Sequence, residues 1–213
     1  MKGLIVDFHG TVVGVKRLEE WIEAGLRASN SDAAPENLKE VLRDVWKLGR
    51  KRYPNGDWDL DASKHRQTFT EVLDEETGCP QALIDALYDV MPAQWVPLSG
   101  AAELLDAARA ADIPVCLLSN IALDPRPRLD EIGLLEKFDE VVLSYEVGVV
   151  KPDPQIFRLA AVKLGLAPEE CLMIGDTPGI DDGGAHIGMT CVIVPVGNAA
   201  SPLEPITRCL QLC

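Results

Sequence analysis

An acidic residue follows the first apolar run of the chain. Residues 4–6, Leu-Ile-Val, suit a strand that is buried on both faces of a parallel sheet. A charge at the carboxyl end of such a strand is costly unless it has a partner or a task. Gly10 permits the backbone to bend, and Thr11 offers a hydroxyl and an N–H beside it. Because ligands of open α/β sheets collect at the carboxyl ends of the strands, Asp7 is the first candidate for chemistry.

Two further segments place polar side chains where predicted strands end or helices begin. A strand over 113–118 ends in Ser119 and Asn120, and Lys151 precedes the Pro-Asp-Pro sequence that opens a helix. A hydroxyl with neighbouring N–H groups, together with one ammonium, can stabilise the charge on the equatorial oxygens of a phosphoryl group. Taken singly, a serine at a strand end and a lysine before proline are ordinary loop residues. The inference that they act together rests on their order along the chain and on their positions at a strand end and before a helix.

An acidic cluster is expected beside Asp7. A strand over 171–174 is followed by Asp176 and, five residues later, by Asp181. Carboxylates packed together at strand ends repel one another unless a cation neutralises them. Ligands that are all oxygens favour a hard cation such as magnesium. The alternative interpretation is a loop of capping aspartates before a helix that begins at Asp181.

Strands and helices alternate over the second half of the chain, and this alternation predicts the fold. Helices are expected between the strands, and the one over 152–164 closes at Gly165, a plausible helix C-cap. Alternation of this kind means right-handed crossovers and a doubly wound parallel sheet of the α/β class. The first strand is joined in this sheet by four others, at 113–118, 141–143, 171–174 and 190–194.

Four consecutive helices are expected between the first strand and the rest of the sheet. Their apolar stripes begin near Leu18, Pro35, Ser63 and Pro80. Four helices inserted after a first strand fit a helical cap domain better than additional sheet. We therefore expect a core domain of residues 1–15 and 96–213 and a cap domain of residues 16–95.

The ordered motifs resemble those of the haloacid dehalogenase-like hydrolases, whose phosphatase members begin with Asp-x-Asp-Gly-Thr. The resemblance covers about the first fifteen residues and everything after about Val96, and the segment between looks like the helical cap of that family. It implies a Rossmann-like core and a magnesium-dependent phosphatase that acts on a small phosphorylated metabolite. The matching segments are Asp7-Phe-His-Gly-Thr11, Ser119-Asn120, Lys151-Pro-Asp-Pro154 and Gly175-Asp176 with Asp181-Asp182.

The resemblance implies a nucleophile and a metal site. Asp7 attacks phosphorus and forms an aspartyl intermediate that water later cleaves. The family pattern makes Asp7 and Asp176 direct ligands of Mg²⁺, together with the backbone carbonyl of His9. Asp181 would not bind the metal directly. It would contact the metal through a water molecule, or contact the residues that are direct ligands.

The resemblance also implies a phosphate-binding set. Ser119 would hold one phosphoryl oxygen, and Lys151 would neutralise these oxygens and steady the Asp7 carboxylate. Gly10, Thr11 and Asn120 are further candidates for substrate binding.

One position departs from the phosphatase pattern. The second aspartate of the first motif normally protonates the leaving group, and here His9 stands in its place. His9 could supply that proton, which gives the phosphatase reading. Two alternatives stay open: a metal-independent, dehalogenase-like hydrolysis of a carbon–halogen or related bond, and a non-catalytic ligand-binding domain. Asp176 and Asp181 argue against the dehalogenase-like alternative, because a metal-free site gains nothing from their charge.

A basic cluster stands out in this acidic chain. It could grip the distal anionic group of a substrate, and Arg50 and Arg52 are the better candidates because they approach a turn-rich loop. It could equally be a solvated helix face that pairs with Glu36, Glu40 and Asp44. The cluster comprises Arg43, Lys47, Arg50, Lys51 and Arg52.

Composition limits the possible partners. The 213 residues have a net charge of −14, which argues against nucleic acid and anionic membrane surfaces as partners. The six cysteines show no metal-binding spacing. The chain begins directly in a predicted core strand and has no long apolar stretch, so we expect a reduced, cytoplasmic setting. A small phosphorylated molecule is the expected partner, and the choice between monomer and homodimer stays open.

Overall fold

The computed structural model describes residues 1–54, 57–194 and 203–211. The chain divides into two compact units. Residues 1–14 and 97–213 form the core unit, and residues 15–96 form the helical unit. The chain passes between the units at β2 (Val13–Val15) and β3 (Trp95–Pro97), which together form a two-stranded sheet.

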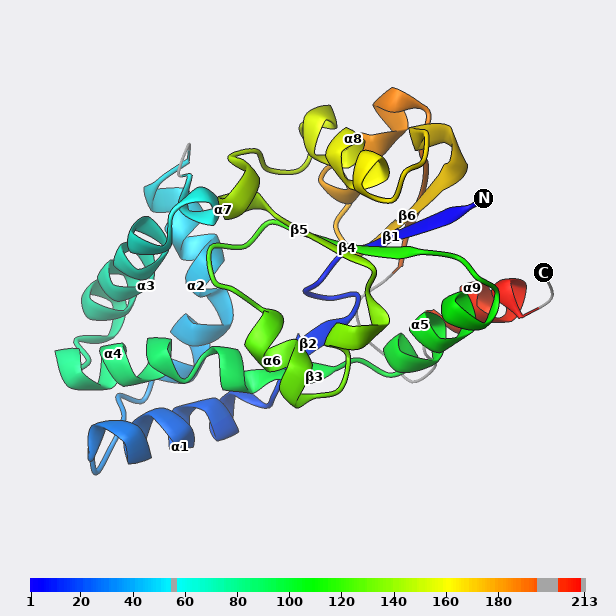
Figure 1. Cartoon of the computed structure of the whole chain (residues 1–213). Coiled ribbons are helices and arrows are strands. Elements are labelled where there is room, and N and C mark those ends of the chain that lie inside the picture. The colour runs from blue at the N-terminus through cyan, green and yellow to red at the C-terminus, as the bar shows by residue number, and fades with distance from the viewer. Residues whose placement is uncertain (55–56, 195–202, 212–213) are drawn as a thin grey trace. The chain divides into compact units, whose positions relative to one another are not determined.

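The core unit is built on a five-stranded sheet with the order β5-β4-β1-β6-β7 (Figure 1). All neighbouring strands are parallel, and Val6 of β1 lies beside Leu117 on one side and Ile174 on the other. The central strand β1 is therefore hydrogen-bonded on both edges. The strands are β1 (Gly3–Val6), β4 (Val115–Ser119), β5 (Glu140–Leu143), β6 (Cys171–Gly175) and β7 (Thr190–Ile193).

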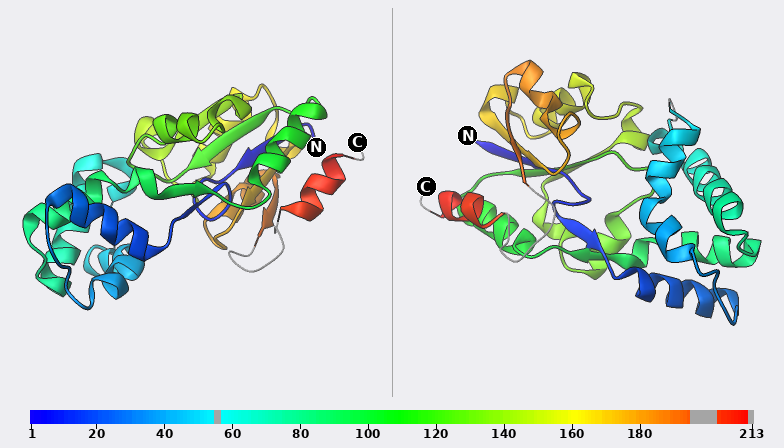
Figure 2. Two further views of the ribbon diagram at one scale, coloured as in Figure 1. Left: turned by 90° about the horizontal axis from the view of Figure 1, so that it is seen from below. Right: turned by 180° about the vertical axis from the view of Figure 1, so that it is seen from behind.

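Helices cover both faces of this sheet. On one face, α8 (Pro154–Lys163) buries Phe157 in a cluster with Ile5 and Cys116 of the strands. Successive strand residues point to opposite faces, so Leu4 and its counterparts face the other way. On that side lie α5 (Ala101–Ala110) and α9 (Glu204–Leu210), as Figures 1 and 2 show. The expectation of a doubly wound parallel α/β sheet is confirmed.

Two connections differ from the expected helices. The helix expected between the strands at 113–118 and 141–143 is short: α6 spans Arg126–Glu131 and is followed by a single 3₁₀ turn at Leu135–Lys137. The helix expected to begin at Asp181 is a 3₁₀ segment, Asp181–Ile187. Gly183 and Gly184 lie inside this segment, and glycine is a poor α-helix former. A four-residue helix, α7 (Ser144–Val147), follows β5 directly.

The described residues of the helical unit form four α-helices around a core of their own. α1 packs against α4, and α2 packs against α3. The indole N–H of Trp21 donates to the backbone oxygen of Leu87 at 2.9 Å, which satisfies a polar atom inside this core. Within the described residues, no helix of the chain is long and apolar enough to cross a membrane. The four helices are α1 (Leu18–Ser29), α2 (Leu38–Arg52), α3 (Ala62–Thr77) and α4 (Gln81–Asp89).

Candidate active site

The three central strands bring the candidate residues of the core unit to one edge of the sheet. Asp7 follows β1, Ser119 ends β4, and Asp176 follows β6. β1 lies between the other two strands, and all three run in the same direction. The backbone N–H of Asp7 donates to the oxygen of Ile174 at 2.9 Å, which extends the ladder to the catalytic candidate itself. The carboxylates of Asp7, Asp176 and Asp181 therefore lie within 4.8 Å of one another.

Lys151 joins this acidic cluster from the loop before α8. Its ammonium donates to Oδ1 of Asp7 at 2.5 Å, to Oδ1 of Asp181 at 2.6 Å and to the backbone oxygen of Leu118 at 3.3 Å. An ammonium has three donors, and here all three are engaged by the protein. Burial alone would lower the pKa of Lys151, but the two carboxylates outweigh it and raise that pKa above its ordinary value. Lys151 is therefore a charged group that orders the carboxylates.

Both carboxylate oxygens of Asp181 accept hydrogen bonds from the protein. Oδ1 accepts from Lys151, and Oδ2 accepts from the backbone N–H groups of Asp176 (3.0 Å) and Thr177 (2.9 Å). The residue is 1% exposed. A carboxylate with this many internal donors holds the loop after β6 and the lysine in place.

Two oxygens of the cluster are open. Oδ1 of Asp7 accepts from Lys151, and Oδ1 of Asp176 accepts from the Thr177 hydroxyl at 3.1 Å. Within the described residues, Oδ2 of Asp7 and Oδ2 of Asp176 form no hydrogen bond with protein groups. These two oxygens have the chemistry that a hard cation requires.

The turn after β1 brings the backbone close to Asp176. Gly10 has a φ of +81°, and a Cβ added to it would overlap the Asp176 carboxylate. Glycine therefore permits both the left-handed backbone and the close approach. The N–H of Gly10 donates to the oxygen of Val13 at 2.8 Å, so it is not available to a substrate.

The Thr11 hydroxyl has no hydrogen-bond partner among the described residues. The side chain is 1% exposed, and its Oγ1 forms no hydrogen bond within the described residues. A buried polar atom without a partner costs about 1–3 kcal/mol, so this hydroxyl is suited to a water, ion or ligand oxygen. The carboxylate oxygens of Asp7, Asp176 and Asp181 are themselves a set of oxygen ligands that fits Mg²⁺.

The balance of charge supports a cation at this centre. Three carboxylates face a single ammonium, and burial is the main reason that the pKa of Asp7 rises to about 6. Lys151 lowers the pKa of Asp7, whereas Asp181 and Asp176 raise it. Burial likewise raises the pKa of Asp176. A divalent cation would favour the ionised form of both groups.

The remaining candidates of the core unit have defined surroundings. Ser119 is 1% exposed at the end of β4. Both ends of the Asn120 amide are bonded to the backbone of Lys151. The His9 ring lies edge-on to the Phe8 ring, with 4.6 Å between the centroids. His9 also forms a backbone bridge with Val13 in the turn after β1.

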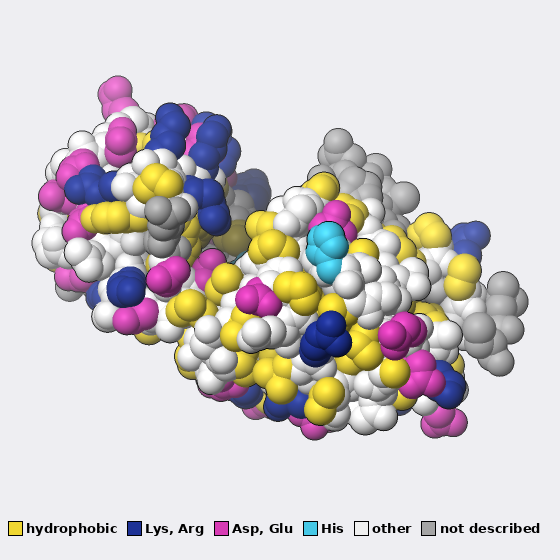
Figure 3. Space-filling view, turned by 90° about the horizontal axis from the view of Figure 1, so that it is seen from above, with side chains coloured by type: hydrophobic (Ala, Val, Ile, Leu, Met, Phe, Trp, Pro, Cys, Tyr) yellow, Lys and Arg dark blue, Asp and Glu magenta, His cyan; other side chains and the backbone are white. Residues whose placement is uncertain are grey.

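Arg50 and Arg52 belong to the helical unit, at the end of α2. Arg52 is bonded to Glu75 and Glu71, so its charge is already paired. The guanidinium of Arg50 lies 5.2 Å from the ring centroid of Trp58. Figure 3 shows Lys and Arg side chains gathered on the surface of this unit, and the exposed cations of α2 are Lys39, Arg43, Lys47, Arg50, Lys51 and Arg52.

Two residues of this site have no role in the sequence analysis. Thr177 donates its hydroxyl to Asp176 and its N–H to Asp181. Ser144 is fully buried and bonded to the backbone of Ile121. Ser144 directly follows the strand expected at 141–143, and a polar residue at that position is the signal that could have identified it.

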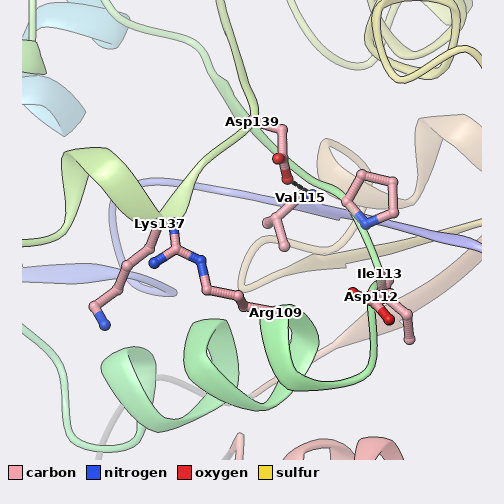
Figure 4. Close-up of a pocket in the computed structure, with 7 residues that line it drawn as sticks. Arg109, Asp112, Ile113, Val115, Lys137 and Asp139 are labelled. Carbon is pink, nitrogen blue, oxygen red and sulfur yellow. Dashed lines mark hydrogen bonds between the residues drawn. The ribbon is translucent and has the colours of Figure 1, made fainter.

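A separate pocket of about 230 Å³ lies at the opposite end of β4 (Figure 4). Three of its four charged residues, Arg109, Lys137 and Asp139, are bonded to neighbours. Arg109 donates to the backbone oxygen of Glu136 at 2.6 Å, and Asp139 accepts from the N–H of Val115 at 2.7 Å. Val115 begins β4, whereas Ser119 ends it, so this pocket is distinct from the acidic centre.

The sheet and the acidic centre define the general class. The chain is a doubly wound α/β protein with three carboxylates and a buried lysine at the carboxyl ends of its central strands. Residues 1–187 match the family model of the haloacid dehalogenase-like hydrolases. The chain belongs to that family, as its motifs predict.

Curated relatives include phosphatases. The chain is 38% identical to a phosphoserine phosphatase of Thermus thermophilus over 137 residues, which is 62% of this chain and 54% of that enzyme. It is 30% identical to a glyceraldehyde 3-phosphate phosphatase of Methanopyrus kandleri, over 93% of this chain and 85% of that protein. The match thus spans about half the length of the Thermus enzyme and most of the Methanopyrus protein.

Solved structures with this fold include a family enzyme with bound magnesium and phosphate and a haloacid dehalogenase. A family enzyme of Bacteroides thetaiotaomicron, in complex with magnesium and inorganic phosphate, has a TM-score of 0.62 at 20% identity. That match covers 95% of this chain and 98% of the other. The L-2-haloacid dehalogenase of Xanthobacter autotrophicus has a TM-score of 0.69 at 21% identity, over 97% and 83% of the two chains. At these identities the likeness shows the fold alone.

Proposed function

We propose that this chain hydrolyses the phosphomonoester of a small metabolite through an aspartyl-phosphate on Asp7, with Mg²⁺ as its cofactor. One observation carries the proposal: Lys151 engages one oxygen of the buried Asp7 carboxylate, the other oxygen accepts no hydrogen bond from the described residues, and the carboxylates of Asp7, Asp176 and Asp181 gather within 4.8 Å of one another. The phosphatases among the relatives support phosphate transfer as the chemistry.

The proposed reaction has two steps, and the second returns the protein to its starting state. In the first, the Asp7 carboxylate attacks phosphorus, a phosphorus–oxygen bond forms to Asp7, and the bond to the leaving-group oxygen breaks. His9 gives that oxygen its proton. In the second, water cleaves the aspartyl-phosphate, inorganic phosphate departs, and the proton that the water loses returns to His9. Asp7 is then a carboxylate again.

The other residues of the centre stabilise charge. Asp7, Asp176 and the backbone oxygen of His9 would hold Mg²⁺, with Asp181 acting through its hold on the loop. The ion supplies positive charge beside the phosphoryl oxygens when it is bound.

Two further side chains complete the phosphate site. Ser119 and the orphaned hydroxyl of Thr11 are the candidate contacts to phosphoryl oxygens. Lys151 keeps Asp7 ionised and oriented through its short bond to Oδ1.

We assign the helical unit the role of a cap that selects the substrate. Arg50 is the better candidate for a distal anionic group, because it forms no ion pair with a carboxylate of the described residues. Arg52 is held by Glu71 and Glu75 and is better explained as a structural residue of this unit.

The dehalogenase-like alternative rests on His9, which replaces the aspartate of the phosphatase pattern. The three carboxylates around one ammonium argue against it, since this charge is a cost in a site without a metal. A non-catalytic ligand-binding role is the other alternative, and the intact set of Asp7, Ser119 and Lys151 argues against that.

The test is a phosphate-release screen over a panel of phosphorylated metabolites, with and without Mg²⁺, using Asp7→Asn as the blank. A 2-haloacid is added to the panel, and halide release is measured in parallel. We expect phosphate release that EDTA abolishes and Mg²⁺ restores. Halide release that is insensitive to EDTA would support the dehalogenase reading, and ligand-induced stabilisation without any product would support the binding role.

A further inference from the structure

The side chain of Asn120 is turned toward the protein backbone. Its Nδ2 donates to the backbone oxygen of Lys151 at 2.9 Å, and its Oδ1 accepts from the N–H of Lys151 at 2.7 Å. The two residues are 31 positions apart in the sequence. An amide that pairs both of its ends with one residue holds the backbone of that residue in a defined place and orientation.

The position of that backbone matters because of what the lysine does. The ammonium of Lys151 lies at the end of a flexible four-carbon stem and meets Asp7, Asp181 and the Leu118 oxygen at once. The residue is 4% exposed, so the stem has little freedom once its Cα is held. A displacement of about 1 Å at the backbone would spoil a three-acceptor geometry, and such displacements can cost about a hundredfold in rate.

Ser144 holds the other side of Asn120. The hydroxyl of Ser144 accepts from the N–H of Ile121 at 2.9 Å and donates to the oxygen of Ile121 at 3.1 Å. Ser144 is fully buried and begins α7 immediately after β5. The residue before Asn120 is also held, because Ser119 pairs with Leu143 in the ladder between β4 and β5. Asn120 is therefore held on both sides before it reaches Lys151.

We propose that Asn120, supported by Ser144, is a positioning residue that sets the Lys151 ammonium between Asp7 and Asp181. This assignment replaces a role for Asn120 as a substrate ligand. Its effect on turnover rests on the proposed function, whereas its effect on Lys151 itself does not.

The first experiment is a double-mutant cycle with Asn120→Ala and Lys151→Ala, read as kcat and KM on an activated aryl phosphate. We expect Asn120→Ala to lower kcat by roughly ten- to a hundredfold with KM within about twofold of wild type. In the Lys151→Ala background the same change should cost less than about threefold, because the group it positions is gone. A raised KM, or an equal loss in both backgrounds, would mark Asn120 as a substrate ligand and overturn the proposal.

The matched control is Asn37→Ala in the helical unit. Asn37 also donates its amide to a backbone oxygen, that of Glu76 at 2.7 Å. Removal of that bond should leave kcat and KM unchanged.

The second experiment does not require activity. The folded, full-length protein is acetylated with acetic anhydride, and labelling of each lysine is followed by mass spectrometry. Lys151 should be strongly protected in the wild type and react at least about tenfold faster in Asn120→Ala, with a smaller increase in Ser144→Ala. The exposed Lys163 should be labelled at the same rate in all three proteins, which excludes global unfolding.

Unchanged protection of Lys151 in folded Asn120→Ala would overturn the positioning role, whatever the enzyme does. If Asn120→Ala does not fold, Ser144→Ala provides the same comparison. Faster labelling in a protein without phosphatase activity would uphold the positioning role and reject the proposed function.

Discussion

The fold places the Asp7 carboxylate where ionisation is unfavourable. It is buried, shares a small space with two other carboxylates, and has one ammonium as its counterion. The raised pKa, about 6, expresses that cost. A residue that is costly to ionise and still remains at the centre of the sheet points to chemistry more than to stability.

This cost gives a prediction for the metal-free protein. The folded state holds its Asp7 proton up to about pH 6, whereas the unfolded chain loses it near 3.8, so stability falls as pH rises between these values. Two pKa units correspond to about 3 kcal/mol. Asp7→Asn in EDTA should therefore be more stable than wild type at pH 8, with the difference closing by pH 4. Urea unfolding, followed by far-UV circular dichroism, measures the free energy of unfolding of the two proteins at each pH.

The same variant should lose turnover by at least about a thousandfold, because an amide cannot form the aspartyl-phosphate. A destabilised Asp7→Asn at pH 8 would mean that the Lys151 ion pair outweighs burial. Appreciable turnover by this variant would reject Asp7 as the nucleophile.

In the proposed reaction, His9 gives the leaving group its proton, so its removal should affect some leaving groups more than others. We expect His9→Ala to slow hydrolysis of an alkyl phosphate at least about tenfold more than hydrolysis of a nitrophenyl phosphate, because an activated phenolate leaves without a proton. His9→Asp restores the aspartate of the phosphatase pattern and should recover the alkyl substrate. The measurement is kcat/KM for both substrates in the three proteins. Equal losses on both substrates would mean that His9 only packs against Phe8.

At the scale of elements, the turn between β1 and β2 is constrained at Gly10 by both its backbone and its neighbour. Gly10→Ala forces a Cβ into the Asp176 carboxylate and holds alanine at a left-handed φ. Gly165→Ala is the matched control, since Gly165 has a φ of +71° and no heavy atom within 4 Å of an added Cβ. Both variants should lose about 1–2 kcal/mol for the left-handed backbone, and Gly10→Ala about 1–3 kcal/mol more for the overlap. Equal losses in urea unfolding would show that Asp176 moves away freely.

Helix α3 carries the buried histidine of the helical unit. His65 lies 4.1 Å from the ring of Trp46, and its Nδ1 is 2.8 Å from the hydroxyl of Tyr88. Burial lowers the pKa of His65 to about 4, so the imidazole is neutral inside this core. Protonation therefore favours the unfolded state, in which the pKa is close to 6.5.

Stability of the helical unit should consequently be fully present above pH 6.5 and be lost as pH falls toward 4, by up to about 3 kcal/mol. The four tryptophans, at 21, 46, 58 and 95, all belong to this unit, so their fluorescence reports its unfolding alone. His65→Gln should show a flatter dependence between pH 4.5 and 7. A wild type whose urea midpoint does not change over this range would contradict the neutral assignment.

At the scale of the whole molecule, net charge and the acidic centre both predict stabilisation by a divalent cation. The chain has a net charge of −14, and the three carboxylates of the centre concentrate part of it. Mg²⁺ at a hundred times its dissociation constant should add about 2.7 kcal/mol to the free energy of unfolding. Asp176→Ala should abolish that gain, whereas the exposed Asp130→Ala should retain it. Calorimetry that finds an unchanged magnesium affinity in Asp176→Ala would remove Asp176 from the metal site.

The order of the elements is legible in the sequence by itself. Apolar runs such as 4–6 and 171–174 have no polar alternation, which is the pattern of strands buried on both faces. Their spacing by helical segments implies the parallel doubly wound sheet that the structure contains. The family follows from four short motifs in a fixed order. These properties are local, so one pass along the chain reveals them.

The pairing of side chains is different, because it depends on residues that are far apart in the chain. The sequence places Asn120 beside Ser119, but only the fold turns its amide onto Lys151. The same holds for the two oxygens of Asp181, which are consumed by Lys151 and by the loop after β6. Residue types and strand ends determined where chemistry is possible. Distance and orientation between loops decided which oxygens are open, because hydrogen bonds require both within narrow limits.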